Sequence, residues 1–211
     1  MTAARVVLLR HGRTGHNHAG LWQGQLDVPL DDVGQAQAEA AAEGLGRRVA
    51  AWAEAGESVR LVSSDLSRAH ETAVALASRT GLDLTTDKRL REIHAGAWQG
   101  LTRAEIAASP MAGELSAWAS GEDVAVGGGE RRSEAGRRAA GCLVELAASM
   151  DGGTLVAVTH GGVMRGATLT LLGLASGDWW LFGGVGNCHL VDLQPGSPRW
   201  RMLAYNVNAA S

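Results

Sequence analysis

The chain has 211 residues, 45% of them hydrophobic, and its formal net charge at pH 7 is −3. A chain of this length can bury most of its apolar surface without disulfides or a structural metal. The lack of excess positive charge argues against nucleic acid or an anionic membrane as a partner, and no segment approaches the roughly 18 uninterrupted apolar residues of a membrane span. The two cysteines, Cys142 and Cys188, form no C-x-x-C pair and are expected to be buried reduced thiols, which fits a cytoplasmic protein.

In the first half of the chain, short runs rich in Val and Leu alternate with alanine-rich segments. This pattern predicts a strand over 5–9, a helix over 31–52, a strand over 59–63, a helix over 64–79 and a strand over 82–86. Asp31 is a good N-cap residue for the first helix. Ser64 or Asp65 is expected to cap the second helix, which Gly81 ends.

The second half shows the same alternation after an irregular stretch. We expect two short helices over 101–109 and 113–119 and a longer helix over 130–149. A strand over 154–159 and a helix over 163–172 follow, and two strands over 188–193 and 199–205 close the sheet. Alternating strands and helices predict an α/β fold with three layers, α/β/α, around a mostly parallel central sheet. Residues 1–211 are expected to form a single domain, with 93–130 as a candidate cap over the site.

Two of the predicted strands run directly into a histidine followed by glycine. These histidines are His11 and His160, and a third strand leads to Arg68 in the first turn of its helix. In open α/β sheets, ligands bind at the carboxyl ends of the strands. The backbone N–H groups of a helix start also favour an anion there. The sequence therefore predicts that both histidines, Arg68 and the neighbouring Arg10 meet at one edge of the sheet.

This set of side chains suits phosphate chemistry. Arginine binds phosphate oxygens in bidentate fashion and keeps its charge, so Arg10 and Arg68 are candidates for phosphate binding. A histidine nitrogen is a competent nucleophile near neutral pH, and a phosphohistidine splits one hard step into two easier ones. The leaving alkoxide needs a proton, and Glu92 is the candidate donor, which could later activate water. Zinc held by His11 and His160 is an alternative, but the two arginines would repel a divalent cation.

Four motifs resemble, in the same order, those of the histidine phosphatase superfamily, also called the phosphoglycerate mutase-like family. They are Leu9-Arg10-His11-Gly12-Arg13-Thr14, Ser63-Ser64-Asp65-Leu66-Ser67-Arg68-Ala69, Leu90-Arg91-Glu92 with Gly96-Ala97-Trp98-Gln99-Gly100, and Thr159-His160-Gly161-Gly162. The resemblance runs from residue 5 to about residue 193. The chain departs from the family's G-G-E-S segment, because Arg131 follows Gly128-Gly129-Glu130, which puts a substrate-binding role for this loop in doubt.

The resemblance implies a metal-independent phosphatase that uses no cofactor and acts on a small-molecule phosphoester. It implies His11 as the nucleophile and Glu92 as the proton donor. The residues that it implies for binding phosphate or substrate are Arg10, Arg68, His160, Asn17, Thr14, Gln23, Gly24 and Gly161. Trp22 and Trp98 are expected to border the pocket.

A narrower resemblance, to the actinobacterial glucosyl-3-phosphoglycerate phosphatases, rests on Gln23-Gly24-Gln25-Leu26-Asp27, Arg79-Thr80-Gly81-Leu82 and Trp98-Gln99-Gly100-Leu101-Thr102. It implies glucosyl-3-phosphoglycerate or a related sugar or sugar-acid phosphate as the substrate. It also implies a homodimer, and exposed tryptophans such as Trp179 and Trp180 are candidates for the contact between the two copies. Three alternatives stay open: a phosphoglycerate mutase, a phosphatase of broad specificity, and a binding protein that has lost catalysis.

Overall fold

The computed structural model of the chain describes residues 3–197 and 199–211. Six strands form one sheet in the order β3-β2-β4-β1-β5-β6. Their bounds are β1 (Arg5–Arg10), β2 (Val59–Ser63), β3 (Leu84–Thr86), β4 (Thr154–Thr159), β5 (His189–Gln194) and β6 (Arg201–Asn208). The first four are parallel to one another, whereas β5 pairs antiparallel with β1 and β6 pairs antiparallel with β5.

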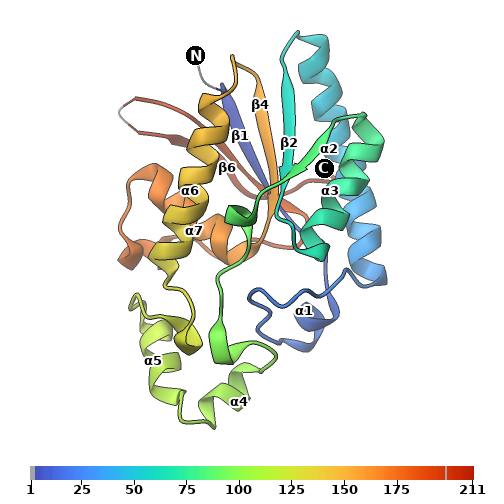
Figure 1. Cartoon of the computed structure of the whole chain (residues 1–211). Coiled ribbons are helices and arrows are strands. Elements are labelled where there is room, and N and C mark those ends of the chain that lie inside the picture. The colour runs from blue at the N-terminus through green and yellow to red at the C-terminus, as the bar shows by residue number, and fades with distance from the viewer. Residues whose placement is uncertain (1–2, 198) are drawn as a thin grey trace.

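Helices cover both faces of this sheet (Figure 1). One face packs against α2 (Asp32–Glu54) and α3 (Ser67–Thr80), and the other against α6 (Arg132–Ala148) and α7 (Gly161–Leu172). Alternate residues of β1 enter the two cores: Val7 and Leu9 face α2 and α3, whereas Val6 and Leu8 face α6 and α7. A strand buried on both faces needs a continuous apolar run. The predicted three-layer α/β/α fold is therefore confirmed.

Three short helices lie at the end of the sheet opposite the N-terminus (Figure 1). They are α1 (Gly15–Ala19), α4 (Arg103–Ala107) and α5 (Ala112–Ser120). The remaining helical turns are η1 (Lys88–Leu90), η2 (Gly96–Trp98), η3 (Val126–Gly128) and η4 (Ser176–Leu181). Between residues 3 and 211, leaving out residue 198, no helix combines the length and apolar character of a membrane span.

Most predicted elements are confirmed, although several boundaries differ by a few residues, as at α4 and α6, which begin at Arg103 and Arg132. The expected cap of α3, Ser64 or Asp65, is wrong: α3 begins at Ser67, because the Asp27 carboxylate accepts hydrogen bonds from Ser67 N at 2.7 Å and Ser67 Oγ at 2.9 Å. The structure places the start of α7 at Gly161, close to the expected start at about residue 163. The N–H groups of Gly162 and Val163 bind a side chain from a distant loop, so this helix starts at Gly161.

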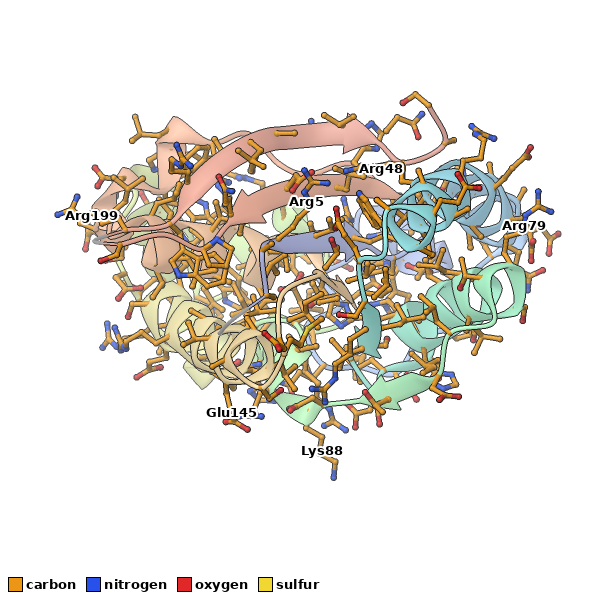
Figure 2. The ribbon with its side chains drawn as sticks, turned by 90° about the horizontal axis from the view of Figure 1, so that it is seen from above. Arg5, Arg48, Arg79, Lys88, Glu145 and Arg199 are labelled. Atoms are coloured by element: carbon orange, nitrogen blue, oxygen red, sulfur yellow. The ribbon has the colours of Figure 1, made fainter. Side chains whose placement is uncertain are left out.

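Charged pairs gather at the amino-terminal end of β1, far from the carboxyl ends of the parallel strands. Arg5 and Arg48 extend from β1 and α2 in this region (Figure 2). Both contact the buried carboxylate of Asp192 in β5, at 3.4 Å and 2.9 Å, and both guanidiniums lie over the Trp52 ring. Because Asp192 is 6% exposed, these pairs join α2 to the sheet in a partly desolvated setting.

Trp179 does not lie on the surface, so the expectation that it is exposed is wrong. It is 3% exposed, whereas its neighbour Trp180 is 51% exposed. The guanidiniums of Arg132 in α6 and Arg165 in α7 lie 4.8 Å and 4.3 Å from the Trp179 ring. These cation–π contacts hold η4 against α6 and α7.

Two glycines allow α6 and α7 to cross at close range. A Cβ atom added to Gly136 would lie 2.7 Å from the carbonyl carbon of Gly166, a distance that real Cβ atoms do not reach. Gly141, in the same helix, has open space around it. The contact between α6 and α7, the helices on either side of β4 in the chain, therefore depends on one small residue from each partner.

We expect Gly136→Ala to lower the free energy of unfolding by about 1–3 kcal/mol, because the added methyl group forces the two helices apart. Gly141→Ala is the matched control and should raise it by up to about 1 kcal/mol, since alanine is the better helix former. Urea denaturation of the two variants checks this. Equal effects from both would show that the helix contact is not the cause.

Candidate active site

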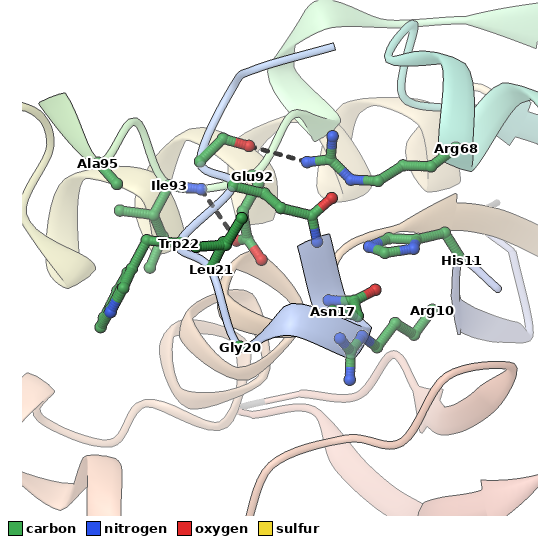
Figure 3. Close-up of a pocket in the computed structure, with 12 residues that line it drawn as sticks. Arg10, His11, Asn17, Gly20, Leu21, Trp22, Arg68, Glu92, Ile93 and Ala95 are labelled. Carbon is green, nitrogen blue, oxygen red and sulfur yellow. Dashed lines mark hydrogen bonds between the residues drawn. The ribbon is translucent and has the colours of Figure 1, made fainter. Parts of the chain in front are cut away.

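A pocket of about 340 Å³ opens at the carboxyl ends of the parallel strands (Figure 3). Its lining residues are Arg10, His11, Asn17, Gly20, Leu21, Trp22, Gln23, Gly24, Arg68, Glu92, Ile93 and Ala95. This volume lies at the lower end of the roughly 300–1,000 Å³ that is usual for small-molecule sites. The pocket therefore has room for more than a phosphate group.

His11 directly follows β1 and is 2% exposed. Its Nδ1 lies 2.6 Å from the Gly12 carbonyl oxygen, which can only accept, so Nδ1 carries the proton. The second ring nitrogen, Nε2, therefore has a free lone pair. Burial, together with the charges of Arg10 and Arg68, holds the pKa of His11 well below its usual value. The ring is consequently neutral near pH 7, as a nucleophile must be.

His160 lies behind His11 at the end of β4 and does not line the pocket. The two rings meet edge to face with centroids 5.1 Å apart. Arg68 Nε donates to His160 Nδ1 at 3.2 Å, so the ring proton lies on Nε2, which is 2.9 Å from Ser64 Oγ. Burial, followed by the charge of Arg68, lowers the pKa of His160 well below the ordinary value. His160 is thus a neutral side chain that orients Arg68.

The guanidiniums of Arg10 and Arg68 are held by main-chain carbonyls. Arg10 Nη1 donates to Val185 O at 2.5 Å, and Arg68 donates to Leu26 O and Gly24 O at 2.8 Å each. Arg68 is fully buried, which lowers its pKa to about 10, and burial also lowers the pKa of Arg10. Neither forms a salt bridge within residues 3–197 and 199–211. Both charges thus remain available to an anionic ligand.

Glu92 enters the pocket from the segment that follows β3 and η1. Its carboxylate accepts hydrogen bonds from the backbone N–H groups of Ile93, Gly162 and Val163 at 2.8–2.9 Å. The last two belong to the first turn of α7. The carboxylate is therefore fixed at the start of a helix, facing the pocket beside both guanidiniums.

The loop after β1 brings Asn17 and Gln23 to the pocket. Thr14 Oγ1 accepts from Asn17 N at 3.1 Å and lies 2.9 Å from Gln23 Oε1. Asn17 Oδ1 also accepts from Asn187 Nδ2 at 3.3 Å. Thr14 itself is fully buried and does not line the pocket. Thr14 therefore fixes Asn17 and Gln23, which line the pocket, from a position outside the lining.

Two glycines at the start of α7 make space for the pocket side chains. A Cβ atom on Gly161 would lie 3.3 Å from Arg10 Nε, and one on Gly162 would lie 2.7 Å from Glu92 Oε1. Gly161 does not line the pocket. The His-Gly-Gly motif of the sequence is therefore explained by the close approach of an arginine and a glutamate to one helix end.

Seven of the ten predicted site residues thus line one pocket, and three lie directly behind it: Thr14, His160 and Gly161. The sequence reasoning missed Gly20, Leu21, Ile93 and Ala95, because no pattern marks apolar loop residues as ligand contacts. Trp22 lines the pocket as expected, whereas Trp98 is fully buried beneath it. Among the side chains that the structure describes, no three His, Cys, Asp or Glu residues gather as metal ligands do.

Comparison with known proteins agrees with this geometry. The sequence profile of the histidine phosphatase superfamily (branch 1) matches residues 6–208. The chain therefore belongs to the histidine phosphatase superfamily, and it is a phosphatase.

Several relatives extend over nearly the whole chain. The glucosyl-3-phosphoglycerate phosphatase of Mycobacterium tuberculosis is 41% identical, with 99% of this chain and 97% of the relative covered. The metal-independent phosphoserine phosphatase of Arabidopsis thaliana is 34% identical, with 89% and 76% covered. A solved structure of the mycobacterial glucosyl-3-phosphoglycerate phosphatase with VO3 superposes with a TM-score of 0.87 at 41% identity, covering 97% of this chain and all of that one.

The lowered pKa values of His11 and His160 predict that stability falls in acid. Both rings stay neutral in the folded protein below the ordinary histidine pKa of about 6.5, whereas the unfolded chain takes up protons there. The unfolded state then binds more protons, so the free energy of unfolding falls as the pH drops below about 6.5. Each group contributes up to about 1.4 kcal/mol per pH unit.

Urea denaturation between pH 7.5 and pH 5 measures this slope. His160→Gln should make the slope shallower by up to about 1.4 kcal/mol per pH unit, because one of the two groups is gone. The matched control is His70→Gln, at an exposed position on α3, which should leave the slope as in the wild type. A slope that His160→Gln does not change would contradict the neutral, buried state of this ring.

Proposed function

We propose that the protein hydrolyses phosphomonoesters of small molecules through a phosphoryl group carried on Nε2 of His11, without a metal or another cofactor. The observation that carries this proposal is the free Nε2 of a neutral histidine beside two guanidiniums that have no carboxylate partner in the described residues. These are the nucleophile and the charge that phosphoryl transfer requires.

The first step forms the bond between His11 Nε2 and phosphorus and breaks the ester P–O bond. Arg10 and Arg68 bind the phosphoryl oxygens, with Asn17 and Gln23 at the side of the pocket. Glu92 enters this step in its protonated form and gives the proton to the leaving oxygen, so the product is a neutral alcohol and Glu92 becomes a carboxylate. In the second step water attacks phosphorus, its proton goes to Glu92, and the P–N bond breaks. Inorganic phosphate leaves and both residues return to their starting states.

Glucosyl-3-phosphoglycerate is the substrate that we propose first. The support is the name and the 41% identity of the mycobacterial relative, together with the near-complete coverage of both chains. Broad activity on sugar and sugar-acid phosphates is the second candidate, since a relative at 34% identity is named a phosphoserine phosphatase. The two candidates predict different rates of phosphate release from a panel of phosphoesters: a single substrate is hydrolysed much faster than the others in the first case, and several are hydrolysed at similar rates in the second.

Phosphoglycerate mutase activity and phosphate binding without turnover remain the alternatives. A relative from Arabidopsis thaliana, 37% identical over 77% of this chain, is named phosphoglycerate mutase-like protein 4. A mutase returns the phosphoryl group to a bound sugar acid, whereas a phosphatase releases it to water. Free phosphate as the product therefore separates a phosphatase from both alternatives.

Three further features belong to the proposal. Residues 1–211 form one domain in which 93–130 caps the site, supported by Ile93 and Ala95 in the pocket and by a small apolar cluster within this segment. The protein is a homodimer, supported by the exposed side chains of Trp180 and Leu181. It is cytoplasmic, supported by two buried free cysteines, which fit a reducing compartment.

A panel of phosphoesters, assayed for phosphate release with metal-stripped protein, tests the proposed function. We expect the wild type to release phosphate with chelator present and to leave an acid-labile phosphoryl group on His11 during turnover. His11→Ala should lower turnover by at least about 10⁴-fold, because it removes the nucleophile. The control His70→Ala, at an exposed position, should act as the wild type does. Appreciable turnover by His11→Ala would sink the phosphohistidine mechanism.

Glu92→Gln should separate substrates by their leaving group. An alkyl phosphate needs a proton on its leaving oxygen, so we expect its kcat to fall by about 10²–10⁴-fold. The kcat for p-nitrophenyl phosphate, whose leaving group is stable without a proton, should fall much less. Glu145→Gln, on the exposed face of α6, is the matched control. Equal slowing of both substrates would remove Glu92 from the role of proton donor.

A further inference from the structure

The pocket has two chemically different sides. Figure 3 shows Arg10, His11 and Arg68 on one side and Trp22, Ile93 and Ala95 on the other, with Glu92 between them. On the second side, none of the described lining residues carries a charge. The first side suits a phosphoryl group, and the second presents mainly apolar side chains.

Phosphoryl transfer fixes which part of a substrate meets each side. The attacking and leaving atoms lie roughly in line through phosphorus, so the leaving oxygen points away from His11. If Glu92 gives the proton to that oxygen, the oxygen lies beside Glu92. The rest of the leaving group then extends past Glu92 to the apolar side, where Trp22 presents the largest side chain.

Trp22 is held in place by a group of packed rings. Its ring meets Trp98 and Trp118 edge to face, with centroids 4.8 Å and 5.1 Å apart. Trp98 is fully buried at the centre of a cluster that also contains Ile106, Leu115 and Val126. Each ring pair adds about 0.5–1.5 kcal/mol beyond the area it buries. The apolar side of the pocket is therefore packed against this cluster and is already formed before a ligand enters.

The backbone of this wall is fixed as well. Trp22 N donates to Leu101 O at 2.9 Å, and Gly100 N donates to Trp22 O at 2.8 Å. Next to it, Gln99 Oε1 accepts from Gln25 N at 2.8 Å. The loop after β1 and the segment around Gly100 thus behave as one surface, with Trp22 facing the pocket and Trp98 beneath it. A preorganised apolar surface of this kind favours a rigid ligand group that fits it.

We propose that Trp22 is the specificity-determining residue for the leaving group and that it binds a sugar ring through the ring's C–H face. The inference rests on the proposed phosphatase function and defines its substrate class: phosphomonoesters whose leaving group carries a sugar. A tryptophan ring offers a large rigid surface for such a face.

The test compares kcat/KM for glucosyl-3-phosphoglycerate with that for 3-phosphoglycerate, which has the same phosphoester but no sugar ring. We expect the wild type to prefer the glucosylated compound, and Trp22→Ala to lower that preference at least about tenfold. Trp22→Phe keeps an aromatic surface and should retain most of the preference. Inhibition by inorganic phosphate, which occupies only the cationic side, should keep its wild-type constant in both variants and so report an intact site.

The matched control is Trp180→Ala. Trp180 contacts Trp118 from outside, with centroids 6.1 Å apart, and is not part of the pocket lining. This variant should keep the wild-type preference. A wild type without preference, or a Trp22→Ala variant that slows both substrates equally, would overturn the role of Trp22 while phosphate release still supports the phosphatase. A wild type that hydrolyses neither compound nor p-nitrophenyl phosphate would overturn both proposals.

Discussion

The site depends on two arginines whose charge is kept inside the protein without a carboxylate partner in the described residues. A buried charge is costly unless it is hydrogen-bonded. Here main-chain carbonyls of Val185, Gly24 and Leu26 supply these bonds. A carbonyl oxygen satisfies a guanidinium N–H but does not cancel its charge. Arg10 and Arg68 are thus oriented in advance and remain free to bind an anion, which is what electrostatic stabilisation of a transition state requires.

The same constraint determines the state of both histidines. A guanidinium beside each imidazole, together with burial, disfavours a proton on the ring, so His11 and His160 are neutral at neutral pH. Their hydrogen bonds then decide which nitrogen is free. The Gly12 carbonyl accepts a hydrogen bond from His11 Nδ1–H, and Arg68 Nε donates to Nδ1 of His160. One histidine is therefore left with an open nitrogen toward the pocket, while the other is fully engaged in orienting Arg68.

Sequence reasoning predicted the parts of this arrangement that local chemistry determines. The strands, the three-layer fold, and the convergence of Arg10, His11 and His160 follow from apolar runs that end in charged or polar residues. Features that depend on contacts between residues far apart in the sequence could not be predicted in this way. Asp27 sets the start of α3, and the start of α7 depends on Glu92, 70 positions earlier in the chain. The apolar side of the pocket was not predicted either, since nothing in the local sequence shows whether Leu21 and Ala95 contact a ligand or pack inside the protein.

The division of the pocket into two sides also reflects how the chain is built. The cationic side comes from the ends of strands and the start of α3, which a sheet buried on both faces holds rigidly. The apolar side comes from loops that pack on their own small cluster around Trp98, separate from the two cores of the sheet. The two sides still share one loop, because the carbonyls of Gly24 and Leu26, close to Trp22 in the chain, hold the Arg68 guanidinium. The side chains on the apolar side can therefore vary with the leaving group, whereas the backbone of this loop has to keep its course for the chemistry.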